Sequence, residues 1–206
     1  MLAVTEEATK RPAVSRAMRS IERAFLMGVD GATEVLLVRH ADCYEALDET
    51  HDDPSLSPTG LEQARRLGER LRQLTVHAVY SSPMRRAVDT AKAIRDDVII
   101  DGRLVEVDVD SSSGYVEVKE PAEACVKRLR AAIDDAVREH TGRRLVMVSH
   151  GVAILNYLCD VLRLDYGTLR LMPYYTSVNV VRILGERRMA GALADIAHLE
   201  GMDWPR

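Results

Sequence analysis

The chain has few cysteines and no long apolar run. Its only cysteines are Cys43, Cys125 and Cys159, and they form neither a Cys-x-x-Cys pair nor a disulfide framework. Such a set favours a reducing compartment, so we expect a cytoplasmic protein. The longest apolar stretches are far shorter than the roughly 20 residues of a membrane span. The first residues carry charges and no apolar signal-peptide core, so we expect no secretory signal and no membrane partner.

An excess of positive charge is also missing. The sequence has 28 lysines and arginines against 32 aspartates and glutamates, a formal net charge of −4. A nucleic-acid-binding protein normally shows a basic excess, so we expect no nucleic-acid partner. The apolar content of 47% and the length of 206 residues suit one globular domain of ordinary size.

Two apolar runs end abruptly in basic residues. Residues 34–38 end in Arg39 and His40, and residues 145–148 end in Ser149, His150 and Gly151. Each run is typical of a strand buried on both faces. In an open α/β sheet, ligands bind beyond the carboxyl ends of the strands. If the two strands are parallel neighbours, both histidines lie at that edge.

Strand and helix patterns alternate along the chain. Further strands are expected at 77–81 and 98–100, helices at about 58–74, 83–94, 121–140 and 151–162, and a β-hairpin at 177–184 and 189–198. This order predicts an α/β fold, a three-layer αβα sandwich with a mostly parallel central sheet. Thr59 and Glu62 have capping-box spacing, Leu61 begins an apolar stripe, and Ser82 is a plausible N-cap before Pro83.

An additional helix is expected near the start. Apolar residues recur at helical spacing between Pro12 and Met27, and glycines follow. We divide the chain into an N-terminal tail and helical extension, residues 1–30, and the main α/β domain, residues 31–206. The favoured interpretation packs this helix on its own domain. A dimer contact, which would make the protein a homodimer, or a lid is the alternative.

Four segments together carry a family resemblance. They are Leu37-Val38-Arg39-His40, the run at 56–64, the Ser81-Ser82-Pro83-Met84-Arg85-Arg86-Ala87 segment, and Val148-Ser149-His150-Gly151. In this order they strongly resemble the histidine phosphatase superfamily, also called phosphoglycerate mutase-like, over about residues 33–184. The resemblance implies a phosphoglycerate mutase-like fold and a phosphomonoester hydrolase that acts through a phosphohistidine intermediate.

The resemblance also implies site residues. His40 matches the nucleophile, Arg39 and Arg86 match phosphate-binding arginines, and His150 matches the second histidine of the site. Glu106 is the candidate proton donor. The Gly-x-x-Glu-Gly pattern that often follows this glutamate is absent here, which weakens its match. Arg85 occupies the variable position of its motif and is expected at the surface.

These residue types suit phosphoryl transfer. Negative charge spreads over the three equatorial oxygens of the phosphoryl group, and Arg39, Arg86 and His150 would surround them with donors. We therefore expect no metal and no cofactor. The nucleophile must be a neutral imidazole, and neighbouring cations would lower the pKa of His40.

The expected substrate is a small phosphorylated molecule, a phosphomonoester with an apolar or neutral leaving group, because Tyr115, Tyr174 and Tyr175 could line the mouth. The acidic loop after His40 disfavours highly anionic substrates, so a phosphatase is preferred to a phosphoglycerate mutase-type phosphotransferase. A non-catalytic binding or assembly module is a further alternative. A metallohydrolase using His40, Asp42 and His150 lacks the usual ligand spacing.

Overall fold

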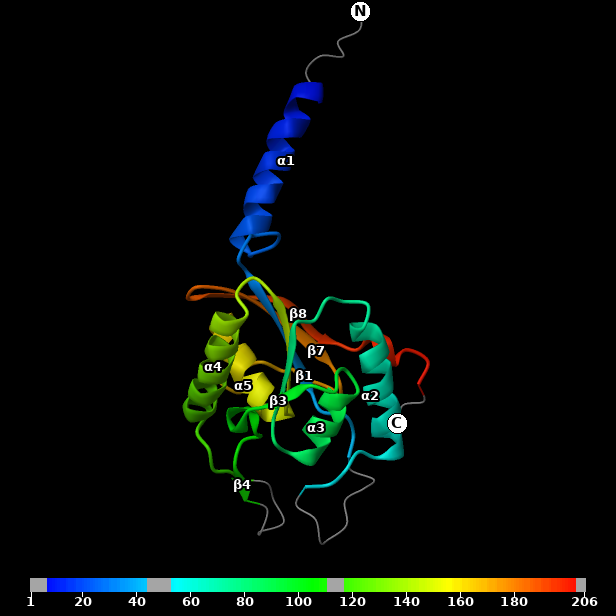
Figure 1. Ribbon diagram of the computed structural model, residues 1–206. Coiled ribbons are helices and arrows are strands. Elements are labelled where there is room, and N and C mark those ends of the chain that lie inside the picture. Colours follow the sequence, from blue (N-terminus) through cyan, green and yellow to red (C-terminus); the bar gives the residue numbers. More distant parts are fainter. Residues whose placement is uncertain (1–6, 44–52, 111–116, 203–206) are drawn as a thin grey trace, which may run out of the picture.

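A six-stranded sheet in the order β3-β2-β6-β1-β7-β8 forms the centre of the molecule (Figure 1). The computed structural model describes residues 7–43, 53–110 and 117–202. Strands β3, β2, β6 and β1 are parallel, and β7 and β8 add an antiparallel hairpin. The strands are β1 Thr33–Arg39, β2 Ala78–Ser81, β3 Val98–Ile100, β6 Arg144–Ser149, β7 Val178–Leu184 and β8 Arg187–Asp195.

Helices cover both faces of the sheet (Figure 1). The helices α2 Pro58–Leu71 and α3 Arg85–Lys92 lie on one face, and α4 Ala122–Glu139 and α5 Gly151–Leu162 lie on the other. The predicted three-layer sandwich with a mostly parallel sheet is confirmed. The segment between β3 and α4 contains a 3₁₀ turn, Gly102–Leu104, and a two-stranded sheet of β4, Val109–Asp110, and β5, Glu117–Val118.

Strand β1 is buried on both faces, as its run of apolar residues predicts. Val35 and Leu37 point into the core under α4 and α5, whereas Leu36 and Val38 point into the core under α2 and α3. All four are at most 3% exposed. Because successive side chains of a strand alternate between faces, one short run contributes to both cores and fixes the register of β1.

That register brings the two basic strand ends together. Arg39 lies opposite Ser149 in the parallel pairing of β1 with β6, and the backbone N–H of His40 donates to the carbonyl of Ser149 at 3.0 Å. His40 and His150 therefore leave neighbouring strands at the same edge of the sheet. The prediction that the two histidines share this edge is confirmed.

Helix α2 starts where it was predicted, but its capping residue differs from the prediction. Ser57, and not Thr59, caps α2, since its Oγ accepts from the backbone N–H of Gly60 at 2.9 Å. Gly60 is required there, because a Cβ at this position would lie 2.0 Å from the carbonyl oxygen of Asp42. Glu62 instead pairs with two arginines of its own helix, and Leu61 is 60% exposed.

Helix α3 begins later than predicted. Its N-cap is Met84, and Ser82 stays outside the helix, where its hydroxyl binds a more distant partner. A local capping preference is weaker than a tertiary hydrogen bond, so the sequence pattern alone misplaces this boundary.

Helix α1, Glu7–Ala24, extends away from the sheet and its covering helices (Figure 1). The expectation that this helix packs on its own domain is wrong. More than half of each of its apolar side chains Val14, Met18 and Ile21 is exposed, and so is that of Phe25, which directly follows the helix. The chain re-enters the domain at Leu26, which is 1% exposed and has a positive φ of 57°.

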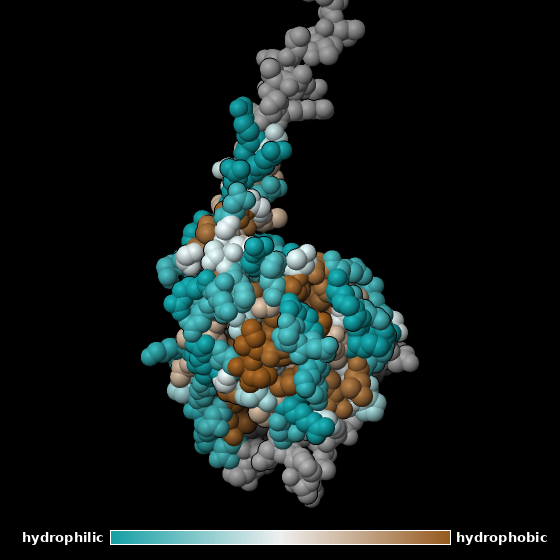
Figure 2. Space-filling view, viewed as in Figure 1, coloured by the Kyte–Doolittle hydropathy of each residue, from teal (hydrophilic) through white to brown (hydrophobic). Residues whose placement is uncertain are grey.

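Apolar surface also occurs on the domain itself. Figure 2 shows apolar areas on the face that carries the edge strand β3, where Ile99 and Ile100 are 43% and 50% exposed. Across the described parts of the chain, no helix combines the length and the apolar character that a bilayer crossing would need. Most of the acidic loop after His40, and Tyr115, lie outside the described residues.

Candidate active site

His40 lies directly beyond the carboxyl end of β1 and is 6% exposed. Its Nδ1 atom is 2.8 Å from the carbonyl oxygen of Ala41, and its Nε2 atom is 3.3 Å from Nε of Arg86. An arginine nitrogen can only donate, so Nε2 is the acceptor and Nδ1 carries the proton. The ring is therefore held in the tautomer that leaves the Nε2 lone pair facing the arginine.

His150 follows β6 and is fully buried. Its ring centroid is 5.1 Å from that of His40. Nδ1 of His150 accepts from Arg86 at 3.4 Å, and Nε2 lies 2.9 Å from the hydroxyl of Ser82. By the same donor rule, the Nε2–H of His150 donates to Ser82. Ser82 is thus a supporting residue that the sequence suggested only as a helix cap.

Arg86 joins the two imidazoles. It is the second residue of α3, and its side chain is 14% exposed. Its third guanidinium nitrogen is 3.5 Å from the carboxylate of Asp53, which also accepts from the backbone N–H of Arg85. Arg85 itself is 63% exposed and faces Asp89, as expected for the variable position of its motif.

Arg39 lies on the other side of His40. Its Nη1 donates to the carbonyl of Pro173 at 2.9 Å, and its guanidinium carbon lies 4.0 Å from the ring centroid of Tyr175, a cation–π contact. Its Nε is buried and has no hydrogen-bond partner among the described residues. A Cβ at Gly151 would approach that Nε to 3.3 Å, so a glycine leaves the arginine the most room.

Thr90 connects the segment after His40 to α3, although the sequence did not single it out. Its hydroxyl accepts from the backbone N–H of Ala41 at 2.9 Å and donates to the carbonyl of Arg86 at 2.7 Å. A threonine four residues after an arginine on a helix is too common a pattern to be a signal. Only the tertiary contact gives Thr90 its function of holding His40 and Arg86 in register.

Burial and charge together keep both imidazoles neutral. The pKa of His40 is lowered from its usual 6.5 to about 3, chiefly by burial and further by the charges of Arg86 and Arg39, while the bond to Ala41 opposes the shift. The pKa of His150 is lowered well below 6.5 by burial and then by His40 and the two arginines. The expected direction is confirmed for His40, but burial is the larger cause.

Glu106 lies beside the start of α5. Its Oε1 accepts from the backbone N–H groups of Val107 at 3.0 Å and Ala153 at 2.8 Å, and its Oε2 accepts from Val152 at 3.2 Å. The carboxylate is therefore fixed against the first turn of α5, next to His150. Glu106 and Arg86 also line one cavity of about 650 Å³, which connects the glutamate to the histidine–arginine cluster.

A metal centre finds no support. Within residues 7–43, 53–110 and 117–202, no group of three His, Cys, Asp or Glu side chains could hold a metal ion. Asp42, which the metallohydrolase alternative needs, accepts instead from the hydroxyl of Ser57 at 2.6 Å. Burial raises the pKa of the nearby Cys43 thiol, so this side chain is a poor nucleophile.

Comparison with known families agrees with this geometry. The sequence model of the histidine phosphatase superfamily (branch 1) matches residues 35–121 and 111–195. These ranges contain Arg39, His40, Arg86, Glu106 and His150. Helix α1 lies outside the match.

Individual relatives carry two kinds of name. The chain is 28% identical to the "Probable phosphoglycerate mutase GpmB" of Enterobacter sp. (strain 638), over 81% of this chain and 95% of that protein. It is 27% identical to the "Metal-independent phosphoserine phosphatase" of Arabidopsis thaliana, over 82% of this chain and 84% of that protein.

A solved structure shares the fold. A mutant phosphoserine phosphatase from Entamoeba histolytica, in complex with phosphoserine, superimposes with a TM-score of 0.68. It covers 81% of this chain and 99% of its own chain at 18% sequence identity. At this identity the similarity establishes the fold alone.

Proposed function

The chain belongs to the histidine phosphatase superfamily, and from this premise we propose that it is a phosphomonoester hydrolase whose nucleophile is His40. One observation carries the proposal. Four side chains from three distant segments, Arg39, His40, Arg86 and His150, surround one point at the sheet edge, with an uncharged ring nitrogen among fixed cationic donors.

The cluster suits a phosphoryl group because every donor around it is fixed. When a phosphoryl group enters, its oxygens compete for the guanidinium of Arg86 and use the unpartnered Nε–H of Arg39. Guanidinium groups stay charged and bind such oxygens bidentately. The charge that develops in the transition state is thus met by preorganised donors, the function that a metal ion serves in other phosphatases.

The reaction then takes two steps. Nε2 of His40 attacks phosphorus while the bond to the leaving oxygen breaks, and the Nδ1–H stays hydrogen-bonded to the Ala41 carbonyl. Protonated Glu106 gives its proton to the departing alkoxide. In the second step Glu106 accepts a proton from water, which attacks phosphorus as the N–P bond breaks. The backbone donors on both carboxylate oxygens keep Glu106 in position throughout.

A phosphoglycerate mutase-type phosphotransferase is the second candidate, because one relative has that name over most of its length. The two activities share the phosphohistidine and differ in its acceptor, which is water in one and a phosphoglycerate in the other. Only a short two-stranded sheet, α4 and β6 separate Glu106 from His150 among the described elements. We therefore keep the hydrolase as the main proposal.

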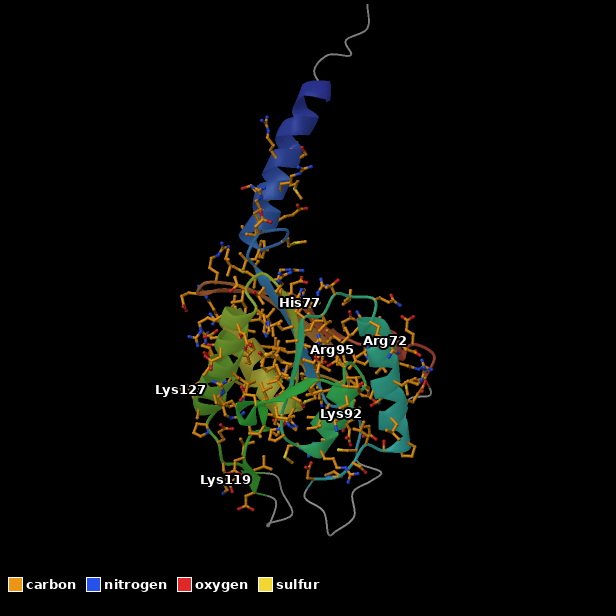
Figure 3. The ribbon with its side chains drawn as sticks, in the orientation of Figure 1. Arg72, His77, Lys92, Arg95, Lys119 and Lys127 are labelled. Atoms are coloured by element: carbon orange, nitrogen blue, oxygen red, sulfur yellow. The ribbon has the colours of Figure 1, made fainter. Side chains whose placement is uncertain are left out.

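The proposal is tested with the full chain and p-nitrophenyl phosphate. Wild type should release nitrophenol and, after a rapid acid-free quench, retain alkali-stable, acid-labile phosphate on one histidine. His40→Gln should lose at least about a thousandfold in kcat and trap no phosphate. The matched control is His77→Gln. His77 directly precedes β2, at the amino ends of the parallel strands, whereas His40 lies beyond their carboxyl ends (Figure 3).

Some outcomes would contradict the proposal. Retained turnover in His40→Gln, or loss of the same size in His77→Gln, would show that His40 is not the nucleophile. Transfer of the trapped phosphate to 3-phosphoglycerate faster than to water would favour the phosphotransferase.

We also propose a reducing, cytoplasmic setting, because Cys43, Cys125 and Cys159 are buried free thiols. The homodimer stays a prediction. Light scattering of the full chain and of a chain without residues 1–24 tests whether α1 joins two copies.

A further inference from the structure

The cavity beside Glu106 is where the leaving group of a phosphomonoester would lie. It has a volume of about 650 Å³ and starts at two residues of the proposed site, Arg86 and Glu106. The other residues that line it have apolar or charged side chains. They come from the N-cap of α3, from the segment 105–109, from the loop before α4 and from α4 itself. These are Met84, Val105, Val107, Asp108, Val109, Glu120 and Arg128.

Arg128 is the cation that a carboxylate-bearing substrate would need here, but all of its donors are already in use. Nε and Nη2 bind the two carboxylate oxygens of Glu120, each at 2.7 Å. Nη1 donates to the carbonyls of Arg103 and Val105, each at 2.7 Å, and Nη2 also donates to the carbonyl of Glu106 at 3.1 Å. A guanidinium has five N–H groups, so none remains for a ligand.

Apart from Arg86, which the phosphoryl group requires, the other titratable groups in the cavity are acidic. Glu120 is neutralised by Arg128, Glu106 supplies the proton in the proposed reaction, and Asp108 adds a carboxylate. Lys119, labelled near β4 in Figure 3, pairs with Glu117 at 2.7 Å and lies 3.8 Å from Asp110. The described walls of the cavity thus offer apolar contacts and negative charge, and no free cationic donor for a second anion.

From this arrangement we infer that the enzyme selects phosphomonoesters whose leaving group has no carboxylate, and prefers a short alkyl chain that ends in an ammonium group. The inference rests on the proposed hydrolase function. Carbon atoms of the chain would contact Met84 and the valines, and the ammonium would lie near the exposed carboxylate of Asp108. An anionic group in the same place would lie against the carboxylate of Asp108, at a Coulomb cost. The preference opposes phosphoserine and phosphoglycerate, which both carry a carboxylate.

The test uses three substrates that differ only at the end of a three-carbon chain. They are 3-aminopropyl phosphate, propyl phosphate and 2-carboxyethyl phosphate. We expect kcat/KM to fall in that order, with at least about a tenfold difference between the ammonium and carboxylate substrates at low ionic strength. In Asp108→Asn the ammonium substrate should lose most of its advantage over propyl phosphate, so the ratio of their kcat/KM values moves towards one.

Glu186→Gln is the matched control, because it removes one carboxylate that is 97% exposed at the turn of the β7–β8 hairpin. It should leave the order and the ratios as in wild type. Equal or faster turnover of 2-carboxyethyl phosphate in wild type overturns the inference. An unchanged ammonium-to-propyl ratio in Asp108→Asn overturns the role of Asp108. If no substrate, p-nitrophenyl phosphate included, is hydrolysed by wild type, the proposed function itself fails.

Discussion

The Nε atom of Arg86 lies 3.3 Å from Nε2 of His40, the ring nitrogen that would attack phosphorus. An arginine donor thus faces the lone pair directly and favours the neutral ring. The same guanidinium reaches Nδ1 of His150 at 3.4 Å, so one cation adds to the effect of burial in keeping both rings neutral. In the proposed mechanism a phosphoryl group would take this donor for its own oxygens, which would free Nε2 of His40 at the moment when the substrate is bound.

This geometry predicts that a charge-conserving change at Arg86 is harmful. Lysine provides one compact ammonium, which cannot reach both imidazoles and a phosphoryl oxygen in a fixed fork. Arg86→Lys should lower kcat/KM by about a hundredfold or more, since more than one charge-assisted hydrogen bond is lost. The measurement is steady-state hydrolysis of p-nitrophenyl phosphate.

Arg85→Lys is the internal control for that experiment. Arg85 is the preceding residue of the same helix, is 63% exposed and lies 3.7 Å from Asp89. Its replacement should leave kcat/KM within about twofold, because exposed ion pairs contribute little. We assign Arg86, rather than Arg85, to the site. Equal losses of kcat/KM in the two variants would contradict this assignment.

Glu106→Gln should separate substrates by their leaving group. The glutamine oxygen can still accept from the backbone N–H groups of Val107 and Ala153, whereas its NH2 group gives up the bond from Val152 and cannot deliver a proton to the leaving group. Turnover of propyl phosphate should fall by about 10²–10⁴-fold, the usual range for general acid catalysis. Turnover of p-nitrophenyl phosphate should fall much less, because nitrophenolate leaves without protonation. Equal losses for both substrates would assign Glu106 to positioning and not to proton transfer.

The lowered pKa values predict histidines that do not titrate near neutrality. With a pKa of about 3, His40 stays neutral between pH 8 and 5, and the pKa of His150 is likewise lowered well below 6.5 by burial and by the neighbouring charges. In ¹H–¹³C NMR spectra, the ring signals that disappear in His40→Gln and His150→Gln should keep their shifts over this range. A midpoint near 6.5 for either signal would contradict the buried, arginine-flanked site.

The same shift connects to stability. The unfolded chain protonates a histidine near pH 6.5, whereas folded His40 does so only near 3, so the unfolded state binds more protons between these values. The free energy of unfolding should therefore fall as the pH is lowered through this window. Denaturation with guanidinium chloride at pH 7 and at pH 5 should show a smaller loss of unfolding free energy for His40→Gln than for wild type. An equal loss would mean that other groups account for the acid sensitivity.

The sequence predicted the parts of the site that depend on buried strands. The apolar runs before Arg39 and before Ser149 are typical of central strands, and parallel pairing then places His40 and His150 side by side. Local signals were less reliable. Ser82 looked like a helix cap, but its hydroxyl binds His150, which is 68 residues away. No pattern over a few residues encodes a partner at that distance.

Helix α1 shows the other limit of sequence patterns. Its apolar stripe, which includes Met18 and Ile21, correctly predicts a helix, but an amphipathic pattern gives no information about what covers the apolar face. The structure shows that the chain's own domain does not cover it, since these side chains are 52% and 53% exposed.

Metal removal provides the last prediction. In the proposed mechanism the charge on the phosphoryl oxygens is balanced by Arg39, Arg86 and His150, and the leaving group by Glu106, so each function of a catalytic metal is filled by a side chain. Prolonged dialysis against EDTA should therefore leave kcat and KM on p-nitrophenyl phosphate unchanged, and added Mg²⁺, Mn²⁺ or Zn²⁺ should not raise the rate. Loss of activity on chelation with recovery by one of these ions would require a metal ligand set that the arginine cluster does not provide. The same dialysis applied to Arg86→Gln sharpens the test, because rescue of that charge-removing variant by a divalent cation would show that the lost charge, and not the lost geometry, limits its rate.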